Sequence, residues 1–263
     1  MDQESTLEYL EAFSGVVSGE ALSALVGRFA REMGYDYFGF TVIIPMSMQR
    51  PKVVIFNQCP DSWVELYTTT NLVARDPVIA LARNQNLPIF WNRLDERARF
   101  LQQGCLDVMN MAAEFGLRNG VSIPLHGARG ENGILSFITR EAASTDLLLG
   151  SSPLLSWMAN YIFDAAIRVV RGELCSGAEK EESLTERETQ CLFWASEGKT
   201  SAEIACILGI AERTVNFHLN QVTRKTGTMN RYQAIAKGVN QGLIRPNLEL
   251  VSVTSYSSSV LLQ

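Results

Sequence analysis

The strongest constraint on folding lies between residues 183 and 244, where two helix-start motifs follow one another closely. Thr185 is followed three residues later by Glu188, and Thr200 is followed in the same way by Glu203. In such a capping box, the hydroxyl and the glutamate side chain each accept a hydrogen bond from the other residue's backbone N–H group. Each motif predicts the start of a helix, so this segment is expected to form a compact group of short helices.

The apolar spacing and the glycines of this segment predict four helices. The first begins after Thr185 and ends near Gly198, and the second ends at Gly209, which can adopt the left-handed conformation of a helix C-cap. A third helix is expected over 212–225 and a fourth over 231–241. Two helices joined by a glycine-containing turn are typical of helix-turn-helix modules, whose second helix enters the major groove of DNA.

The third helix of this group would carry most DNA contacts, because its outward side offers groups that pair with base edges and phosphates. The residues expected to bind DNA are Thr200, Thr214, Asn216, Phe217, Asn220, Gln221, Arg224 and Lys225. Residues 199–245 contain seven basic and two acidic side chains, whereas residues 1–175 contain 14 basic and 19 acidic ones. A basic module on an acidic body is compatible with nucleic-acid binding by that module. An ordinary solvated helical bundle would explain the same charges and helix starts.

Composition narrows the class of protein. The 263 residues are 46% hydrophobic and 19% charged, as in a globular protein of one large or two ordinary domains. The chain has no apolar run of about 18 residues, and its acidic N-terminus lacks the pattern of a secretion signal, so we expect a cytoplasmic protein. Five scattered cysteines and two distant histidines favour neither a disulfide framework nor a metal site.

A polar, charge-dense stretch at 172–183 predicts a linker between a domain over 1–171 and a helical domain over 184–245. A flexible, serine-rich tail is expected over 246–263. Within the first domain, the apolar patterns predict strands at 37–44, 52–56, 120–125 and 133–138 and helices at 19–33, 62–67, 78–83 and 153–171. Helices and strands without regular alternation indicate an α+β fold, an α-β-α sandwich around an antiparallel sheet, followed here by an all-α helix-turn-helix domain.

The segment LTERETQCLFWASEGKTSAEIACILGIAERTVNFHLNQVTRKTG resembles the DNA-binding domain of LuxR-type regulators. The matching residues are Glu188, Leu192, Trp194, Gly198-Lys199-Thr200, Glu203-Ile204-Ala205, Thr214-Val215, His218 and Lys225. The resemblance implies that Asn216 and Asn220 face DNA bases. One departure is Ala211, where such domains often carry a serine; loss of a capping hydroxyl costs a helix about 1 kcal/mol.

The first domain resembles the autoinducer-binding domain of quorum-sensing regulators. The matching stretches are CPDSWVELY, ARDP, LPIFW and GLRNGVSIPLHGARG. The resemblance implies a buried pocket for an N-acyl-homoserine lactone, which acts as a small-molecule effector and not as a cofactor. Together the two resemblances cover nearly the whole chain and imply a signal-responsive transcriptional regulator.

The residues implied to contact the lactone are Cys59, Trp63, Tyr67, Asp76, Trp91 and Ser136. Trp63 can donate its indole N–H to the lactone carbonyl, and Asp76 can accept the amide N–H of the ligand. Ser136 can donate to the amide or acyl carbonyl, while Tyr67 and Trp91 would wall the lactone and the acyl chain. Without the resemblance, the aromatic residues would be interpreted as core side chains and Asp76 as a turn or helix cap.

Cys59 departs from the family's pattern, because many relatives have a tyrosine there whose hydroxyl contacts the ligand carbonyl. A thiol is a smaller and poorer donor, so the pocket is enlarged, compensates with water or prefers another signal. This departure leaves open an alternative, a ligand-independent regulator whose first domain dimerises, docks a protein or binds a different small molecule. An enzyme acting on acyl lactones would need a nucleophile with a base or a metal cluster, which two isolated histidines do not supply.

The expected partners follow from the two domains. They are double-stranded operator DNA, the lactone signal and a second copy of the chain, because helix-turn-helix dimers bind palindromic sites. RNA polymerase is a further candidate partner, and no membrane partner is expected.

Overall fold

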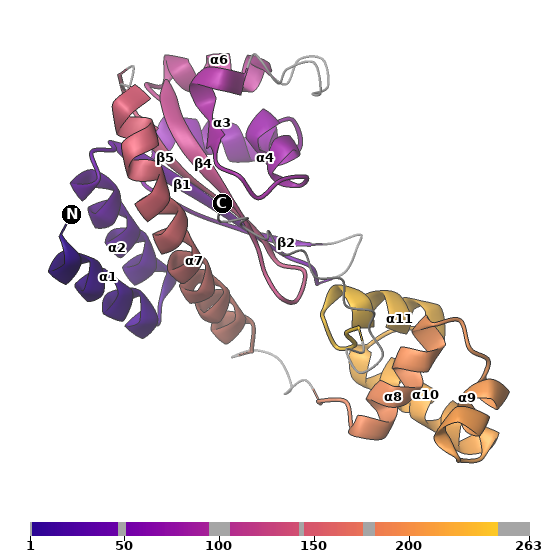
Figure 1. The fold of residues 1–263 in the computed structure, drawn as a ribbon. Coiled ribbons are helices and arrows are strands. Elements are labelled where there is room, and N and C mark those ends of the chain that lie inside the picture. Colours follow the sequence, from indigo (N-terminus) through magenta and orange to yellow (C-terminus); the bar gives the residue numbers. More distant parts are fainter. Residues whose placement is uncertain (1, 47–50, 95–105, 142–144, 176–181, 247–263) are drawn as a thin grey trace, which may run out of the picture. The chain divides into compact units, whose positions relative to one another are not determined.

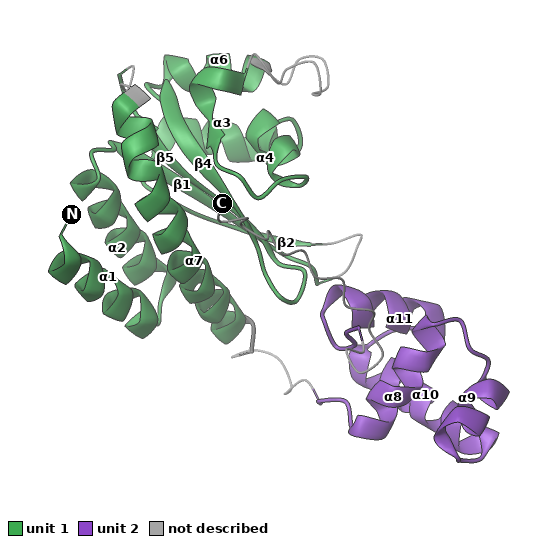
Figure 2. Cartoon of the chain, viewed as in Figure 1, with its two compact units in different colours: residues 1–180 green, residues 181–263 purple. Residues whose placement is uncertain are grey.

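The computed structural model describes residues 2–46, 51–94, 106–141, 145–175 and 182–246. The chain divides into two compact units, residues 1–180 and 181–263 (Figure 2). Apart from Pro246, the tail expected over 246–263 lies outside the described residues. Within the part described, none of the helices combines the length and the hydropathy needed to cross a bilayer.

The first unit is built from a sheet and the helices that flank it (Figure 1). Its strands are β1 (Tyr37–Ile44), β2 (Lys52–Asn57), β3 (Ile89–Phe90), β4 (Asn119–His126) and β5 (Asn132–Thr139). Its α-helices are α1 (Gln3–Gly15), α2 (Gly19–Glu32), α3 (Asp61–Thr69), α4 (Pro77–Ala82), α6 (Leu106–Glu114) and α7 (Thr145–Cys175). The described residues of this unit also form two short 3-10 helices, η1 (Leu72–Ala74) and η2 (Trp91–Arg93).

The strands follow the order β2-β1-β5-β4-β3, and all neighbouring strands are antiparallel. Helices α1, α2 and α7 lie on one face of this sheet, and α3, α4 and α6 lie on the other (Figure 1). The α-β-α sandwich around an antiparallel sheet is therefore confirmed. The four strands expected from the sequence are present, and β3 adds a two-residue fifth strand at the edge.

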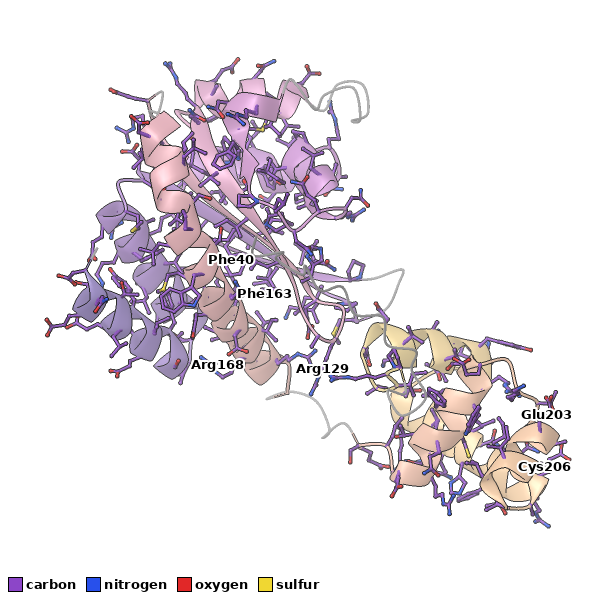
Figure 3. The ribbon with its side chains drawn as sticks, in the orientation of Figure 1. Phe40, Arg129, Phe163, Arg168, Glu203 and Cys206 are labelled. Carbon is purple, nitrogen blue, oxygen red and sulfur yellow. The ribbon has the colours of Figure 1, made fainter. Side chains whose placement is uncertain are left out.

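Side chains alternate along β5 between the two layers, as the pleat of a strand requires. Leu135 and Phe137 belong to the core under α1, α2 and α7, where Phe40 of β1 also meets Phe163 of α7 at a ring-centroid distance of 6.4 Å (Figure 3). On the opposite face, Ile134 and Ile138 pack against the helices α3, α4 and α6. The face under these smaller helices carries the cavity described below.

Helix α7 is longer than the sequence analysis predicted. It begins at Thr145 and not at residue 153, and it ends at Cys175, so residues 172–175 of the expected linker are helical. Gly172 weakens a helix but does not end this one, since the preceding turn is held in the core by Val169 and Val170. Pro153 lies inside this helix, where it removes only one helical N–H donor.

The second unit contains α8 (Glu186–Ser196), α9 (Ser201–Leu208), α10 (Glu212–Thr226) and α11 (Arg231–Asn240). Both predicted capping boxes are formed at the starts of α8 and α9. Helices α9 and α10 end at Gly209 and Gly227, whose φ angles of 65° and 62° are left-handed. Ala211 provides no side-chain cap for α10. The predicted all-α helix-turn-helix unit is confirmed.

Candidate functional site

A cavity of about 90 Å³ lies between the sheet and helices α3, α4 and α6. All six residues expected to contact a ligand line this cavity: Cys59, Trp63, Tyr67, Asp76, Trp91 and Ser136. The rest of the lining is largely apolar, with Val78, Ile79, Val108, Met109, Ala112, Leu117, Ile134 and Ile138 among its members. The structure therefore brings together six side chains that span 78 residues of sequence, from position 59 to position 136.

Asp76 links the cavity to the start of α4. Its Oδ1 accepts hydrogen bonds from the backbone N–H groups of Val78 (2.7 Å) and Ile79 (3.4 Å), which makes it the N-cap of the helix. Its Oδ2 accepts a hydrogen bond from the Tyr67 hydroxyl at 2.8 Å. The helix-cap role considered from the sequence and the cavity-lining role are thus both present in one carboxyl group.

The cavity is a poor environment for charge. Burial raises the pKa of Asp76, while the hydrogen bonds from Tyr67, Val78 and Ile79 act in the opposite direction. Burial and the neighbouring Asp76 carboxylate raise the pKa of Tyr67, so this hydroxyl stays a donor at neutral pH. Among the described residues that line the cavity, none is lysine, arginine or histidine. The lining therefore suits a neutral ligand that offers a hydrogen-bond donor to Asp76.

Trp91, Ser122 and Ser136 form a chain of hydrogen bonds on the face of the sheet that carries the cavity. The indole Nε1 of Trp91 donates to Ser122 Oγ at 2.8 Å, and Ser122 Oγ lies 2.7 Å from Ser136 Oγ. Ser122 and Ser136 face each other across β4 and β5 in the strand register. Ser122 was not among the residues expected from the sequence, because strand alternation predicts which face it occupies but not that Trp91 reaches it from η2, after strand β3.

Trp63 differs from Tyr67, Asp76, Trp91 and Ser136, whose side chains are hydrogen-bonded within the protein. Its ring packs against Tyr67 and Phe115, with centroid distances of 5.4 and 5.7 Å. Among the described residues, its indole N–H has no hydrogen-bond acceptor, yet it is not a fully enclosed polar atom. A donor at the wall of an apolar cavity is suited to a carbonyl group of a ligand.

The Cys59 thiol is hydrogen-bonded to the backbone of the sheet and not to another side chain of the cavity. Its Sγ donates to the backbone carbonyl of Phe38 at 3.3 Å. Burial raises the pKa of the thiol to about 12, so it remains neutral. Cys59 therefore contributes a small apolar surface to the cavity wall and no charge.

The candidate nucleic-acid interface is the outer side of α10. Asn216, Phe217, Asn220 and Arg224 are exposed there, and Thr214 and Gln221 are partly exposed. The side of α10 that faces the core carries Val215, Leu219 and Val222. The helical spacing predicted from the sequence thus places six of the eight expected DNA-binding residues on one accessible side of α10.

Neighbouring groups orient two of these side chains. Asn216 Oδ1 accepts a hydrogen bond of 2.7 Å from Ser201 Oγ at the start of α9. Arg224 is paired with the Glu182 carboxylate at 2.7 Å, and its Nε donates to Gln221 at 3.0 Å. The side chains of Arg224 and Glu182 are 57% and 55% exposed, so water and salt screen this pair.

Thr200 and Lys225 have clear structural roles. The Thr200 hydroxyl belongs to the capping box of α9, although the residue is exposed. The Lys225 side chain is only 11% exposed, and its Nζ lies 2.8 Å from the Glu188 carboxylate and 3.1 Å from the Ser183 carbonyl. Lys225 is therefore turned toward α8, and the structure does not group it with the outward residues of α10.

Comparisons with known proteins match both units. Residues 18–166 match the family model described as the autoinducer binding domain, and residues 182–237 match that of the bacterial regulatory proteins of the luxR family. Within the described residues, no cluster of three or more His, Cys, Asp or Glu side chains could hold a metal ion.

Individual relatives cover almost the full chain. The transcriptional activator protein AhyR of Aeromonas hydrophila is 71% identical over 256 residues, which are 97% of this chain and 98% of that protein. The transcriptional activator protein LuxR of Aliivibrio fischeri is 32% identical and covers 85% of this chain and 88% of its own. A solved structure of SdiA in complex with octanoyl-rac-glycerol, at 28% identity, superposes with a TM-score of 0.72 over 94% of this chain and 99% of that one.

Proposed function

This chain belongs to the luxR family of bacterial regulatory proteins, and from that premise we propose that it binds an N-acyl-homoserine lactone in the cavity of its first unit. It is a LuxR-type quorum-sensing transcriptional regulator with autoinducer-binding and helix-turn-helix domains, a regulator and not an enzyme. We propose the chemical class of the signal, the residues that bind it and a homodimer as the form that binds DNA.

The observation that carries the proposal is the set of polar groups around one apolar cavity. An acyl-homoserine lactone has a lactone carbonyl, an amide N–H, an amide carbonyl and an apolar chain. The Trp63 indole N–H supplies a donor for the first, Asp76 an acceptor for the second and Ser136 a donor for the third. Tyr67 and Trp91 supply aromatic wall, and Cys59 leaves room where a larger aromatic side chain would stand.

The proposed mechanism is linkage between binding and folding. A ligand that binds only the folded first unit stabilises it by about 2.7 kcal/mol at a concentration of 100 times Kd. Asp76 transmits this locally, because the carboxyl group that would accept the ligand amide also caps α4. The stabilised chain would then bind a palindromic operator as a homodimer, with the outer side of α10 in the major groove.

A second ligand class has a specific observation behind it. The structural relative SdiA has been solved with octanoyl-rac-glycerol, an acyl chain attached to a glycerol head. Such a ligand has hydroxyl donors but no amide N–H. An acylglycerol would therefore use the same apolar wall, with a hydroxyl group in place of the amide N–H as the donor to Asp76.

The experiment that tests the proposal is thermal melting of the full chain against homoserine lactones of increasing acyl length, with octanoyl-glycerol in parallel. A concentration-dependent rise in Tm with one lactone class, lost in Asp76→Asn, is the expected result. The asparagine keeps the cap of α4, since Asn and Asp are equivalent N-caps, but removes the charged acceptor. A response to octanoyl-glycerol alone would favour the second ligand class. No response to either would favour a ligand-independent regulator.

The DNA arm is tested separately by titrating operator fragments with the lactone-saturated chain. Dimeric binding predicts two half-sites whose centres lie about 10 base pairs, or a multiple of that, apart. Moving one half-site by about five base pairs should abolish cooperative binding. Equal affinity for a single half-site would contradict the dimer.

A further inference from the structure

A second, smaller cavity lies on the same face of the sheet as the ligand cavity. It has a volume of about 60 Å³. Its lining comprises Ile43, Ile79, Ala82, Arg83, Leu125, His126, Asn132, Gly133 and Ile134. Ile79 and Ile134 line both cavities, so these two side chains stand where the cavities adjoin.

The strand register gives the order of positions along this face. Ser136 pairs with Gly39 and Ser122, and the next row on the same face joins Ile134 to Thr41 and Pro124. The row after that joins Asn132 to Ile43 and His126. Residues two apart on a strand are about 6.7 Å apart along it. The row of Ile134 therefore separates the Ser136 row from the polar end of the second cavity.

The partition is well supported by its surroundings. Ile134 is 5% exposed and Ile79 is 6% exposed, and both belong to one buried cluster with Val78, Ala82 and Ile89. Their β-branched side chains have restricted χ1 rotation, so they do not swing aside freely. Ile79 donates its backbone N–H to Asp76, which ties its position to a carboxyl group that lines the ligand cavity.

We propose that Ile79 and Ile134 form a partition that limits the length of the acyl chain this protein accepts. The inference rests on the proposed function, with the ligand amide near Asp76 and Ser136. An extended chain advances about 1.25 Å per carbon–carbon bond, so the row of Ile134 lies about five bonds beyond that of Ser136. Acyl chains of about four to six carbons end at the partition.

Acyl chains longer than about six carbons are disfavoured for two reasons. They must displace both isoleucines from a packed cluster, and they then enter a cavity whose lining includes Arg83, His126 and Asn132. A hydrocarbon end gains little from that polar surface. Removing the side chain at position 134 joins the two cavities and provides a longer apolar path past the partition.

The test compares dissociation constants of butanoyl-, hexanoyl-, octanoyl- and decanoyl-homoserine lactone for the full-length chain and for Ile134→Ala. The wild type is expected to bind the two short chains more tightly. In the variant, the ratio of the decanoyl to the butanoyl constant should fall at least tenfold, the discrimination that one or two methylenes carry in an apolar pocket.

Ile138→Ala is the matched control. Ile138 lies on the same strand and face, is 4% exposed and lines the cavity on the other side of Ser136. Its loss should weaken all four lactones alike and leave their ratio unchanged. If Ile134→Ala does not fold, Ile79→Val and Ile134→Val make the same comparison with a smaller expected shift.

The outcomes separate the two proposals. A wild-type chain that binds none of the four lactones overturns the lactone proposal itself. A wild-type chain that binds them, with the same length preference in Ile134→Ala, overturns the partition alone. An equal shift in Ile138→Ala also overturns it, because the effect would then come from any added space.

Discussion

The ligand cavity and the outer side of α10 both contain polar side chains that are hydrogen-bonded within the protein, but those of the cavity lie in a largely apolar wall and those of α10 lie at the surface. In the cavity, Tyr67 donates to Asp76 and Trp91 donates to Ser122 within a largely apolar wall. On α10, Asn216 accepts from Ser201 and Arg224 pairs with Glu182 at the surface. A bond broken in the cavity leaves an unpaired group in apolar surroundings, whereas one broken on α10 is replaced by water.

This difference separates the two functions physically. Changes in the cavity should alter both folding and ligand binding, because the same groups serve both. Changes on the outer side of α10 should alter DNA binding while leaving the unfolding free energy almost unchanged. The five predictions below test that contrast, beginning with the largest expected effect.

Asp76→Ala should abolish the response to the cognate lactone. The variant loses the proposed amide acceptor and the cap of α4, and a lost cap costs about 0.5–2 kcal/mol of stability. The measurement is Tm with and without the lactone, with Asp76→Asn as the control that retains a cap. An alanine variant with the full ligand-induced rise in Tm would show that Asp76 is not an anchor.

Lys225→Ala should destabilise the second unit by about 2–3 kcal/mol, less than the 3–5 kcal/mol typical of breaking a fully buried ion pair. The reason is that Glu188, which is 5% exposed, loses its cation. Chemical denaturation measures the change, and Arg213→Ala provides the control, since it removes an equal charge from an exposed site on the same helix. Equal stability of the two variants would refute the structural role of Lys225.

Asn216→Ala and Arg224→Ala should weaken operator binding by about 1–2 kcal/mol each, or roughly 5- to 30-fold. Their side chains are exposed, so Tm should change little. Loss of the phosphate or base contact made by Arg224 should also reduce the salt dependence of binding. Unchanged affinity in both variants would place the recognition surface elsewhere.

The pH dependence of stability should differ between the wild type and Asp76→Asn by up to about 1.4 kcal/mol per pH unit. Burial raises the pKa of Asp76 above its ordinary value of 3.8, so the folded state binds this proton more tightly than the unfolded state. Its contribution is therefore present below pH 3.8 and is lost as the pH rises through the raised pKa. The measurement is the free energy of unfolding of both proteins across this pH window. If it changed with pH in the same way for both, the pKa of Asp76 would not be raised in the folded state.

Glu182→Gln should increase operator affinity by no more than about threefold, and only at low salt. It releases Arg224 from an exposed pair that salt screens. Glu186→Gln, at an exposed position nearby in the sequence, is the control. An effect that persists at high salt would mean that Glu182 does more than hold Arg224.

The sequence was sufficient for features governed by local rules. Both capping boxes and the left-handed Gly209 were predicted because they depend on residues within one turn. The six cavity residues were predicted through resemblance, since no local pattern joins Cys59 to Ser136. Helices α1 and α6 were not predicted, although Tyr9 and Phe13 of α1 are buried.

What could not be predicted depends on contacts between distant segments. Lys225 follows the buried Val222 by three residues, so helical spacing places it at the edge of the core, but the partner Glu188 comes from another helix. Ser122 of β4 and Trp91 of η2 are hydrogen-bonded although they are 31 residues apart in the sequence. The partition of Ile79 and Ile134 exists because the start of α4 packs against the sheet. These relations follow from tertiary packing and not from a motif.

The two left-handed glycines that end α9 and α10 have a consequence for how freely the outward residues of α10 can vary. Gly209 and Gly227 bracket α10, the helix proposed to face DNA, and its buried side is held by Val215, Leu219 and Val222. The length and rotation of α10 therefore do not depend on its outward residues. We therefore expect that substitutions among these outward residues change the preferred operator while leaving the fold of both units intact.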